Sequence, residues 1–287
     1  DYVRKEFLNT SNQDFEQINK IGVVPIFHYL RTSSVDNKDL AVLTGTIVVI
    51  HYSKMHAIES YGNENSYVFT TLKGDDNFVL VTGYDKARKA LVGIITKLFE
   101  DGVFKVLIGT KALLGEGWDA PSINSLILAS FVGSFVSSNQ MRGRAIRRDA
   151  NNPQKTSNIW HLACIDPTDK YGGKELELLK RRFEAFVGIT NTKLPYITNG
   201  FERLGIPNEI SVEDLETLNA SSVSNAAGRA QTFVNWKNSI GEGNKLTRQV
   251  QLQDFKTPQF KAQRQFYFAK ASQLIVIEIV LALVVFF

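Results

Sequence analysis

The sequence predicts an α/β domain with a mostly parallel sheet, followed by a helical appendage. Short apolar runs at 106–108 and 126–128 are bounded by glycine, proline or serine, which is typical of buried parallel strands. An amphipathic helical pattern precedes the first run, as in a right-handed crossover between parallel strands. We therefore expect a sheet-bearing domain over 1–167, a helical appendage over 168–250, and a basic-aromatic segment with an apolar tail over 251–287.

The amino-terminal part alternates between helix and strand patterns. Residues 14–30 show an apolar helical face, with Pro25 as an expected kink. Apolar or β-branched runs bounded by turn residues predict strands at 40–43, 47–50, 67–72 and 78–82. The last two runs flank a Gly-Asp-Asp-Asn turn and predict a hairpin. We interpret residues 46–84 as an insertion that places this hairpin at the sheet edge.

A helix is predicted between Asp85, which can cap its start, and Gly102, which can end it. Its apolar stripe, at helical spacing, consists of Leu91, Ile94, Ile95, Leu98 and Phe99. The helix leads into a strand at 103–108, and a last sheet strand is expected at 158–165. Further helices are expected at 174–187 and over most of 212–240.

Composition sets loose limits on function. The chain has 287 residues, of which 44% are hydrophobic and 22% charged, as in ordinary globular proteins. A formal charge of +4 with a pI near 9.0 fits a nucleic-acid partner without requiring one. The single cysteine, Cys164, excludes an internal disulfide framework and suits a reducing compartment. Cys164 lies in an apolar run, so we predict that it is buried. The four histidines lack metal-ligand spacing, and we interpret them as structural.

The sharpest functional signal lies at 140–147. Asn139 or the serines before it can cap a helix on which Gln140, Gly143, Arg144 and Arg147 share one face. An amide, a gap and two guanidiniums on one face favour contact with a polyanion or an acidic partner. Guanidiniums of this kind neutralise charge that develops in phosphoryl transfer. The alternative is a solvated basic helix, which would leave the amide and the glycine unexplained.

Two segments carry a family resemblance. GTKALLGEGWDAP, from 109 to 121, resembles motif V of the superfamily 2 helicases, and QMRGRAIR, from 140 to 147, resembles their motif VI. The wording of the first is most similar to the helicase subunits of restriction systems. The motifs occur in order, about twenty residues apart, with a predicted strand between them. The resemblance implies the second RecA-like domain of a helicase motor, a fold of the P-loop NTPase type.

The resemblance also implies roles for individual residues. Arg144 and Arg147 match arginines that reach the nucleotide across a cleft, and Gln140 matches a residue that senses the γ-phosphate. Gly117 and Asp119 match positions beside the nucleotide. Thr110 matches a contact to the nucleic-acid backbone, to which Lys111 would add a second. Trp118 departs from the usual small or aliphatic residue, and we expect it to pack under the loop.

The sequence lacks the other half of such a site. It contains no G-x-x-x-x-G-K-[ST] loop and no apolar strand that ends in Asp-Glu, which together hold ATP and Mg²⁺. The expectation is that a first RecA-like domain, missing from this chain, binds both, and that the chain alone is inactive. Residues 1–7 resemble the segment after the motif IV strand, so the chain is expected to begin just after that strand.

The expected partners are that first domain, duplex DNA and subunits of a restriction or defence system. The competing hypothesis is a non-catalytic module with the same fold, which binds nucleic acid or a membrane-bound partner. Residues 274–287 form an apolar run with one acid, Glu278, after a basic and aromatic segment. A truncated membrane helix and a buried core element both remain open for this run. The expected location is the cytoplasm, with membrane association through this tail as the variant.

Overall fold

The computed structural model describes residues 22–33, 35–45, 47–61, 67–83, 85–111, 118–129, 135–169, 171–190, 192, 195–207, 209–241, 268–275 and 278. By their contacts, the residues divide into two compact units. The first comprises Asp1–Lys180 with Glu209–Lys237, and the second comprises Arg181–Asn208 with Asn238–Phe287. The segment at 209–237 of the expected appendage therefore belongs to the same unit as the sheet. Residues 1–21, with part of the expected first helix, lie outside the described residues.

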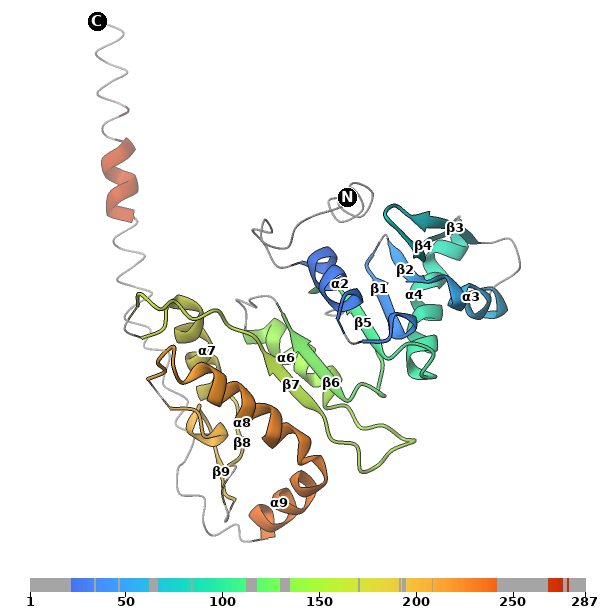
Figure 1. The fold of residues 1–287 in the computed structure, drawn as a ribbon. Helices are drawn as coiled ribbons and strands as arrows, with labels where there is room; N and C mark the ends of the chain where they lie inside the picture. The colour runs from blue at the N-terminus through green and yellow to red at the C-terminus, as the bar shows by residue number, and fades with distance from the viewer. Residues whose placement is uncertain are drawn as a thin grey trace, which may run out of the picture. The chain divides into compact units, whose positions relative to one another are not determined.

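The first unit contains a five-stranded sheet in the order β3-β4-β2-β1-β5 (Figure 1). Its strands are β1 (Leu40–Leu43), β2 (Val48–His51), β3 (Tyr67–Leu72), β4 (Asp75–Gly83) and β5 (Val106–Gly109). The 3₁₀ turns η2 (Asn37–Asp39) and η3 (Tyr52–Lys54) lie before β1 and after β2. β3 and β4 form a hairpin at the sheet edge, as the turn residues between them predict.

The expectation of a mostly parallel, RecA-like sheet is wrong. Among the described strands of this sheet, β1 and β5 pair in parallel, whereas β1–β2, β2–β4 and β3–β4 are antiparallel. The cause is the tight link between β1 and β2, in which the N–H of Thr44 donates to the carbonyl of Ile47 at 2.8 Å. A link this short joins antiparallel neighbours, because a parallel pair needs a long crossover. Apolar runs show where strands lie but not which way they run.

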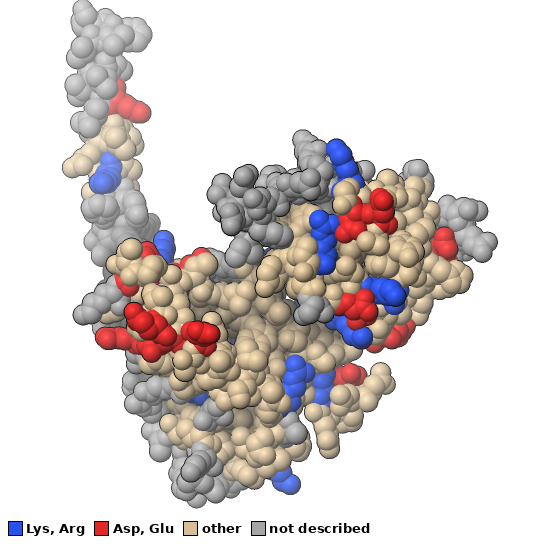
Figure 2. Space-filling model, in the orientation of Figure 1, with Lys and Arg blue, Asp and Glu red and all other residues tan. Residues whose placement is uncertain are grey.

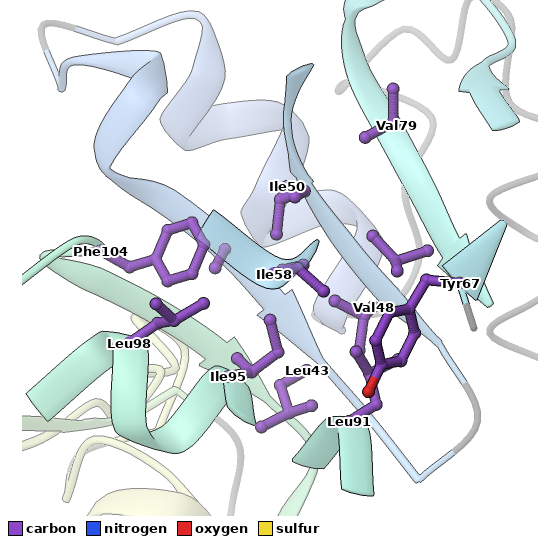
Figure 3. Packing of buried hydrophobic residues seen from close by; sticks show 12 residues of the cluster. Leu43, Val48, Ile50, Ile58, Tyr67, Val79, Leu91, Ile95, Leu98 and Phe104 are labelled. Carbon is purple, nitrogen blue, oxygen red and sulfur yellow. The ribbon is translucent and has the colours of Figure 1, made fainter. Parts of the chain in front are cut away.

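Helices cover both faces of this sheet. They are α2 (Val23–Arg31), α3 (Met55–Tyr61) and α4 (Asp85–Glu100). α3 and α4 share one core with the sheet, in which Ile58, Ile95 and Leu98 point toward the strands (Figure 3). α2 packs on the opposite face, where the rings of Phe27 and Phe78 meet edge to face with centroids 4.8 Å apart. Pro25 lies in the first turn of α2, where its missing N–H removes no helical hydrogen bond.

The unbroken apolar sequence of β1 follows from this double coverage. Ala41 and Leu43 belong to the core under α3 and α4, whereas Leu40 and Val42 belong to the core under α2. Successive strand residues point to opposite faces, and both faces are buried here. Both apolar sets are therefore needed, and the strand shows no alternation with polar residues.

The predicted course of α4 is confirmed. Leu91, Ile95 and Leu98 of its apolar stripe are buried against the sheet. Gly102 follows the helix with φ of +76°, and the N–H of Val103 reaches back to the carbonyl of Leu98 at 2.9 Å. This is a glycine-dependent helix end, in which a left-handed residue satisfies the last carbonyls. It turns the chain directly into β5.

The same unit contains a parallel strand pair beside the main sheet. The pair consists of β6 (Ser125–Leu128) and β7 (Asn158–His161). The helices α6 (Phe135–Ala145) and α8 (Leu215–Ala227) belong to the same unit. Leu126 and Ile159 of this pair pack in one cluster with Leu107 of β5 and Phe99 of α4. β7 is shorter than the predicted strand at 158–165. As a consequence Cys164 is exposed, and the prediction that it is buried is wrong.

The second unit is built around a small aromatic cluster. Its elements are β8 (Gly188–Ile189), β9 (Ile197–Thr198) and η4 (Glu202–Leu204), while α7 (Lys174–Glu184) and α9 (Arg229–Gly241) span its boundaries. The ring of Phe183 meets the rings of Phe186 and Phe201 at centroid distances of 5.5 and 5.3 Å. The Arg203 guanidinium lies 6.0 Å from the Phe183 ring centre. Edge-to-face aromatic contacts and a cation over a ring stabilise this otherwise small core.

The apolar tail at 274–287 lies largely outside the described residues. Within the part of the chain that the structure does describe, no helix combines the length and apolar character needed to cross a bilayer. Leu274 and Ile275 are exposed.

Candidate functional site

The segment at 109–121, which resembles motif V, begins where β5 ends. β1 and β5 run in parallel with Leu43 opposite Gly109. Thr44 and Thr110 therefore follow the carboxyl ends of two neighbouring strands, on the same side of the sheet. The hydroxyl of Thr44 accepts a hydrogen bond from the N–H of Ile47 at 3.0 Å and serves the tight turn. Thr110 is half-buried and Lys111 is exposed. Gly117 lies at 112–117, outside the described residues.

The end of this segment is anchored by Trp118. Its side chain is 8% exposed, and its indole N–H donates to the hydroxyl of Thr96 on α4 at 2.7 Å. That hydroxyl in turn donates to the carbonyl of Val92 at 2.7 Å. Ala120 is also buried, so Asp119 between the two points outward and is exposed. Trp118 is therefore packed into the protein, as expected, whereas the loop over it at 112–117 lies outside the described residues.

The segment at 140–147, which resembles motif VI, departs from the predicted helix at both ends. α6 begins at Phe135, so Asn139 lies inside it, where its side-chain oxygen accepts from Arg142 Nη1 at 3.1 Å. α6 ends at Ala145, so Arg147 lies beyond the helix. The N–H of Arg147 instead reaches the carbonyl of Arg144 at 3.4 Å, in a tightened last turn. The spacing predicts that Arg147 continues the helical face of Gln140, Gly143 and Arg144. This prediction is wrong, because Arg147 lies beyond the end of α6.

The remaining residues of that face follow the helix as predicted. Ser138, Met141 and Ala145 form the buried side of α6, and Met141 packs with Leu128 of β6. Gln140 is exposed, and Arg144 is half-buried. A Cβ atom built on Gly143 would meet no described atom within 4 Å. Within the described chain, the gap at Gly143 thus opens to space that another molecule or domain can occupy.

The structure brings the segments at 109–121 and 140–147 into direct contact. Arg147 Nη1 lies 2.5 Å from Asp119 Oδ1 in an ion pair. Both side chains remain about half exposed, at 48% for Arg147 and 50% for Asp119. An ion pair at this exposure contributes only about 0.2–1 kcal/mol to folding. The pair therefore places the two groups more than it stabilises the protein.

Two further residues join the same segments, and sequence reasoning missed both. Lys155 Nζ donates to the carbonyl of Arg147 at 2.9 Å and also to the carbonyl of Pro121. The hydroxyl of Ser157 lies 2.6 Å from the carbonyl of Ala145 and 3.2 Å from that of Ile123. Burial lowers the pKa of Lys155, and the nearby carboxylate of Asp149 opposes this shift. No spacing rule marks either residue, because both lie in a polar loop.

The predicted residues thus take different positions. Asp119 and Arg147 meet, and Arg144 lies in the last turn of the helix before Arg147. Gln140 is one turn further back, and Thr110 and Lys111 follow the end of β5. Within the described residues no group of His, Cys, Asp and Glu could hold a metal ion. The groups that could act on a ligand here are the guanidiniums of Arg144 and Arg147, which can donate hydrogen bonds to an anion.

On the face drawn in Figure 2, Lys and Arg side chains lie close to Asp and Glu side chains rather than in one continuous basic patch. With a formal charge of only +4, long-range attraction of a polyanion is modest. Recognition of phosphate by this chain would therefore depend on individual, well-placed groups.

Comparison of the chain with family models, with curated proteins and with solved structures finds no match.

Proposed function

We propose that this chain is the part of an ATP-dependent superfamily 2 helicase or translocase that supplies arginine side chains to the ATPase site. ATP and Mg²⁺ are held mainly by a separate P-loop domain, since the sequence contains neither a P-loop nor a strand ending in Asp-Glu. The observation that carries the proposal is the contact between Asp119 and Arg147. It joins the segments that resemble motifs V and VI, although each was identified independently.

The state of Arg147 suits a group that meets a partner across a cleft. Asp119 engages one nitrogen of the guanidinium, and nearly half of the side chain is exposed. A guanidinium carries further N–H donors in a planar fork that matches phosphate oxygens. Asp119 therefore orients the guanidinium while leaving its other N–H donors for a second partner. Arg144 and the open space at Gly143 lie on the adjoining turn of α6.

Nucleic acid is the expected track for such a motor. Thr110 follows a strand that ends at the sheet edge, and Lys111 is exposed beside it. A hydroxyl, a backbone N–H and an ammonium at one strand end are typical contacts to phosphates. Duplex DNA is the proposed substrate, and subunits of a restriction or defence system are the proposed partners, because the wording of motif V is most similar to those helicase subunits.

The proposal is tested by ATP hydrolysis of the complete gene product, with and without duplex DNA. We expect DNA-stimulated turnover, and a loss of about 10³-fold or more on Arg147→Ala or Arg144→Ala. Arg148→Ala is the matched control, because Arg148 is the exposed neighbour of Arg147 and should leave the rate unchanged. A wild-type protein without activity, or arginine variants as active as wild type, would instead favour a non-catalytic binding module.

A further inference from the structure

The loop at 149–157 links the end of α6 to β7 and is held by its own hydrogen bonds. The N–H of Asn151 donates to Asp149 Oδ1 at 2.9 Å, and the N–H of Asn152 donates to the carbonyl of Asp149 at 3.2 Å. The N–H of Lys155 donates to the carbonyl of Asn152 at 3.0 Å. Consecutive turns of this kind fix the path of the chain, so Lys155 returns to the place where the loop began.

The pairing of β6 and β7 determines what Lys155 can reach. The strands are parallel with Ser125 opposite Asn158, and the N–H of Asn158 donates to the carbonyl of Asn124 at 3.0 Å. The residues just before Asn158 therefore run beside the residues just before Ser125. This register brings Lys155 next to Pro121, two residues after Asp119 in the sequence.

Lys155 and Ser157 act at different points of the α6 end. Carbonyls at a helix end lack partners in the helix, and a cation there is favoured by the helix dipole. Ser157 lies against the carbonyl of Ala145, the last residue of α6. Lys155 donates to the carbonyl of Arg147, which has already left the helix. Ser157 thus closes the helix, whereas Lys155 fixes the peptide that carries the guanidinium.

The backbones on both sides of the ion pair are therefore tied to one ammonium group. Lys155 Nζ donates to Pro121 on the Asp119 side and to Arg147 on the other. The ion pair itself is half exposed and weak, so it cannot hold the two segments by its own strength. Hydrogen bonds from a charged donor are stronger than neutral ones, and Lys155 is half-buried.

We propose that Lys155 is a positioning residue, which sets the place of Arg147 by bridging the carbonyls of Pro121 and Arg147. This inference rests on the proposed function, because the place of Arg147 matters only if its guanidinium reaches a nucleotide. In this proposal Lys155 acts through Arg147 and not by a contact of its own with the nucleotide. Misplacement of a catalytic group by about 1 Å can lower a rate about 10²-fold.

The test uses the complete gene product and compares Lys155→Met, Lys155→Arg and Ser157→Ala. Lys155→Met keeps the length of the side chain but removes its donors, and we expect kcat to fall about 10²-fold with little change in the KM for ATP. Lys155→Arg keeps the charge and the donors, and should recover most of the rate. Ser157→Ala removes the neighbouring contacts to the carbonyls of Ala145 and Ile123 but none to Arg147 or Pro121, and should lower stability while leaving kcat nearly unchanged.

The decisive comparison repeats Lys155→Met in an Arg147→Ala background. If Lys155 acts through Arg147, the second change lowers kcat no further. Multiplied losses, an unaffected rate in Lys155→Met, or an equal loss in Ser157→Ala would overturn the inference. If Arg147→Ala alone leaves the rate unchanged, the proposed function fails first and this inference fails with it.

Thermal unfolding followed by circular dichroism shows which variants are folded at the assay temperature. If Lys155→Met is unfolded, Lys155→Gln replaces it, because its amide keeps a donor for one of the two carbonyls. We then expect a partial loss of kcat that again disappears in the Arg147→Ala background. A full wild-type rate in Lys155→Gln would contradict the inference.

Discussion

The contact between Trp118 and Thr96 decides whether the tryptophan anchors a loop or is available to stack on a base. The indole N–H and the Thr96 hydroxyl are 2.7 Å apart, and both residues are at least nine-tenths buried. Thr96→Val preserves shape but leaves the indole N–H buried without this acceptor. Such a group costs about 1–3 kcal/mol.

Trp118→Phe removes the N–H together with part of the ring. We expect it to cost about 1–2 kcal/mol, since it loses the hydrogen bond and leaves a small cavity among Ala120, Ile123 and Ala145. In the double variant the orphaned N–H is absent, so its cost should be smaller than the sum of the single costs by about 1 kcal/mol. A double cost that falls short of the sum by this amount is the signature of a direct buried contact.

The assay is urea unfolding of wild type, both single variants and the double variant, followed by circular dichroism. Affinity for a labelled single-stranded oligonucleotide is measured on the same four proteins and should be unchanged. Additive or negligible costs, together with weaker binding in Trp118→Phe, would refute the buried position. They would also show that Trp118 does not anchor the segment that carries Asp119.

Two further predictions concern Gly143 and His28. Gly143→Leu is compared with Gly93→Leu, because each glycine lies in a helix and a Cβ at either position meets no described atom within 4 Å. Both variants should fold at least as stably as wild type, with gains of up to about 1 kcal/mol from helix propensity. Only Gly143→Leu should slow ATP turnover by the complete gene product, and equal rates for both variants would show that no partner surface approaches α6 there. Burial lowers the pKa of His28 from 6.5 to about 4, helped by Arg31 and opposed by Asp75. Its neutral form is favoured in the folded state, so its contribution to stability is complete above about pH 6.5 and is lost as the pH falls toward 4, by up to about 3 kcal/mol. His28→Gln should flatten this part of the pH dependence of urea unfolding, and an identical slope in both proteins would contradict the assignment.

The sequence predicts local structure well where the signal is local. The stripe of α4 and the stop at Gly102 both depend on residues within one helix, and both are found. The hairpin of β3 and β4 follows from its turn residues. Strand direction is different, because it depends on the length and hydrogen bonding of links such as that between Thr44 and Ile47. The mostly parallel sheet was therefore predicted wrongly, although the apolar runs at 106–108 and 126–128 each pair in parallel with one other strand.

The candidate site shows the same division. The outward position of Asp119 fits the apolar-polar-apolar pattern at 118–120, in which both neighbours are buried. The end of α6 could not be predicted, because the residues that follow it, Ile146 and Arg147, are neither glycine nor proline and give no signal that the helix stops. Contacts from Lys155 and Ser157 satisfy the carbonyls at that end. Such long-range partners are invisible in a sequence in which a loop lysine is usually just solvated.

A crystal structure of the complete gene product with ADP, Mg²⁺ and aluminium fluoride would examine the role of Arg147 at the bound nucleotide itself. We expect the Arg147 guanidinium, released from Asp119 or shared with it, within hydrogen-bonding distance of the fluoride ligands that mimic the transferred phosphoryl group. Lys155 should still hold the carbonyl of Arg147 in that complex. An occupied nucleotide site in which Arg147 remains bound to Asp119 alone, with neither Arg144 nor Arg147 near the fluoride, would contradict the assignment of this chain to an ATPase motor.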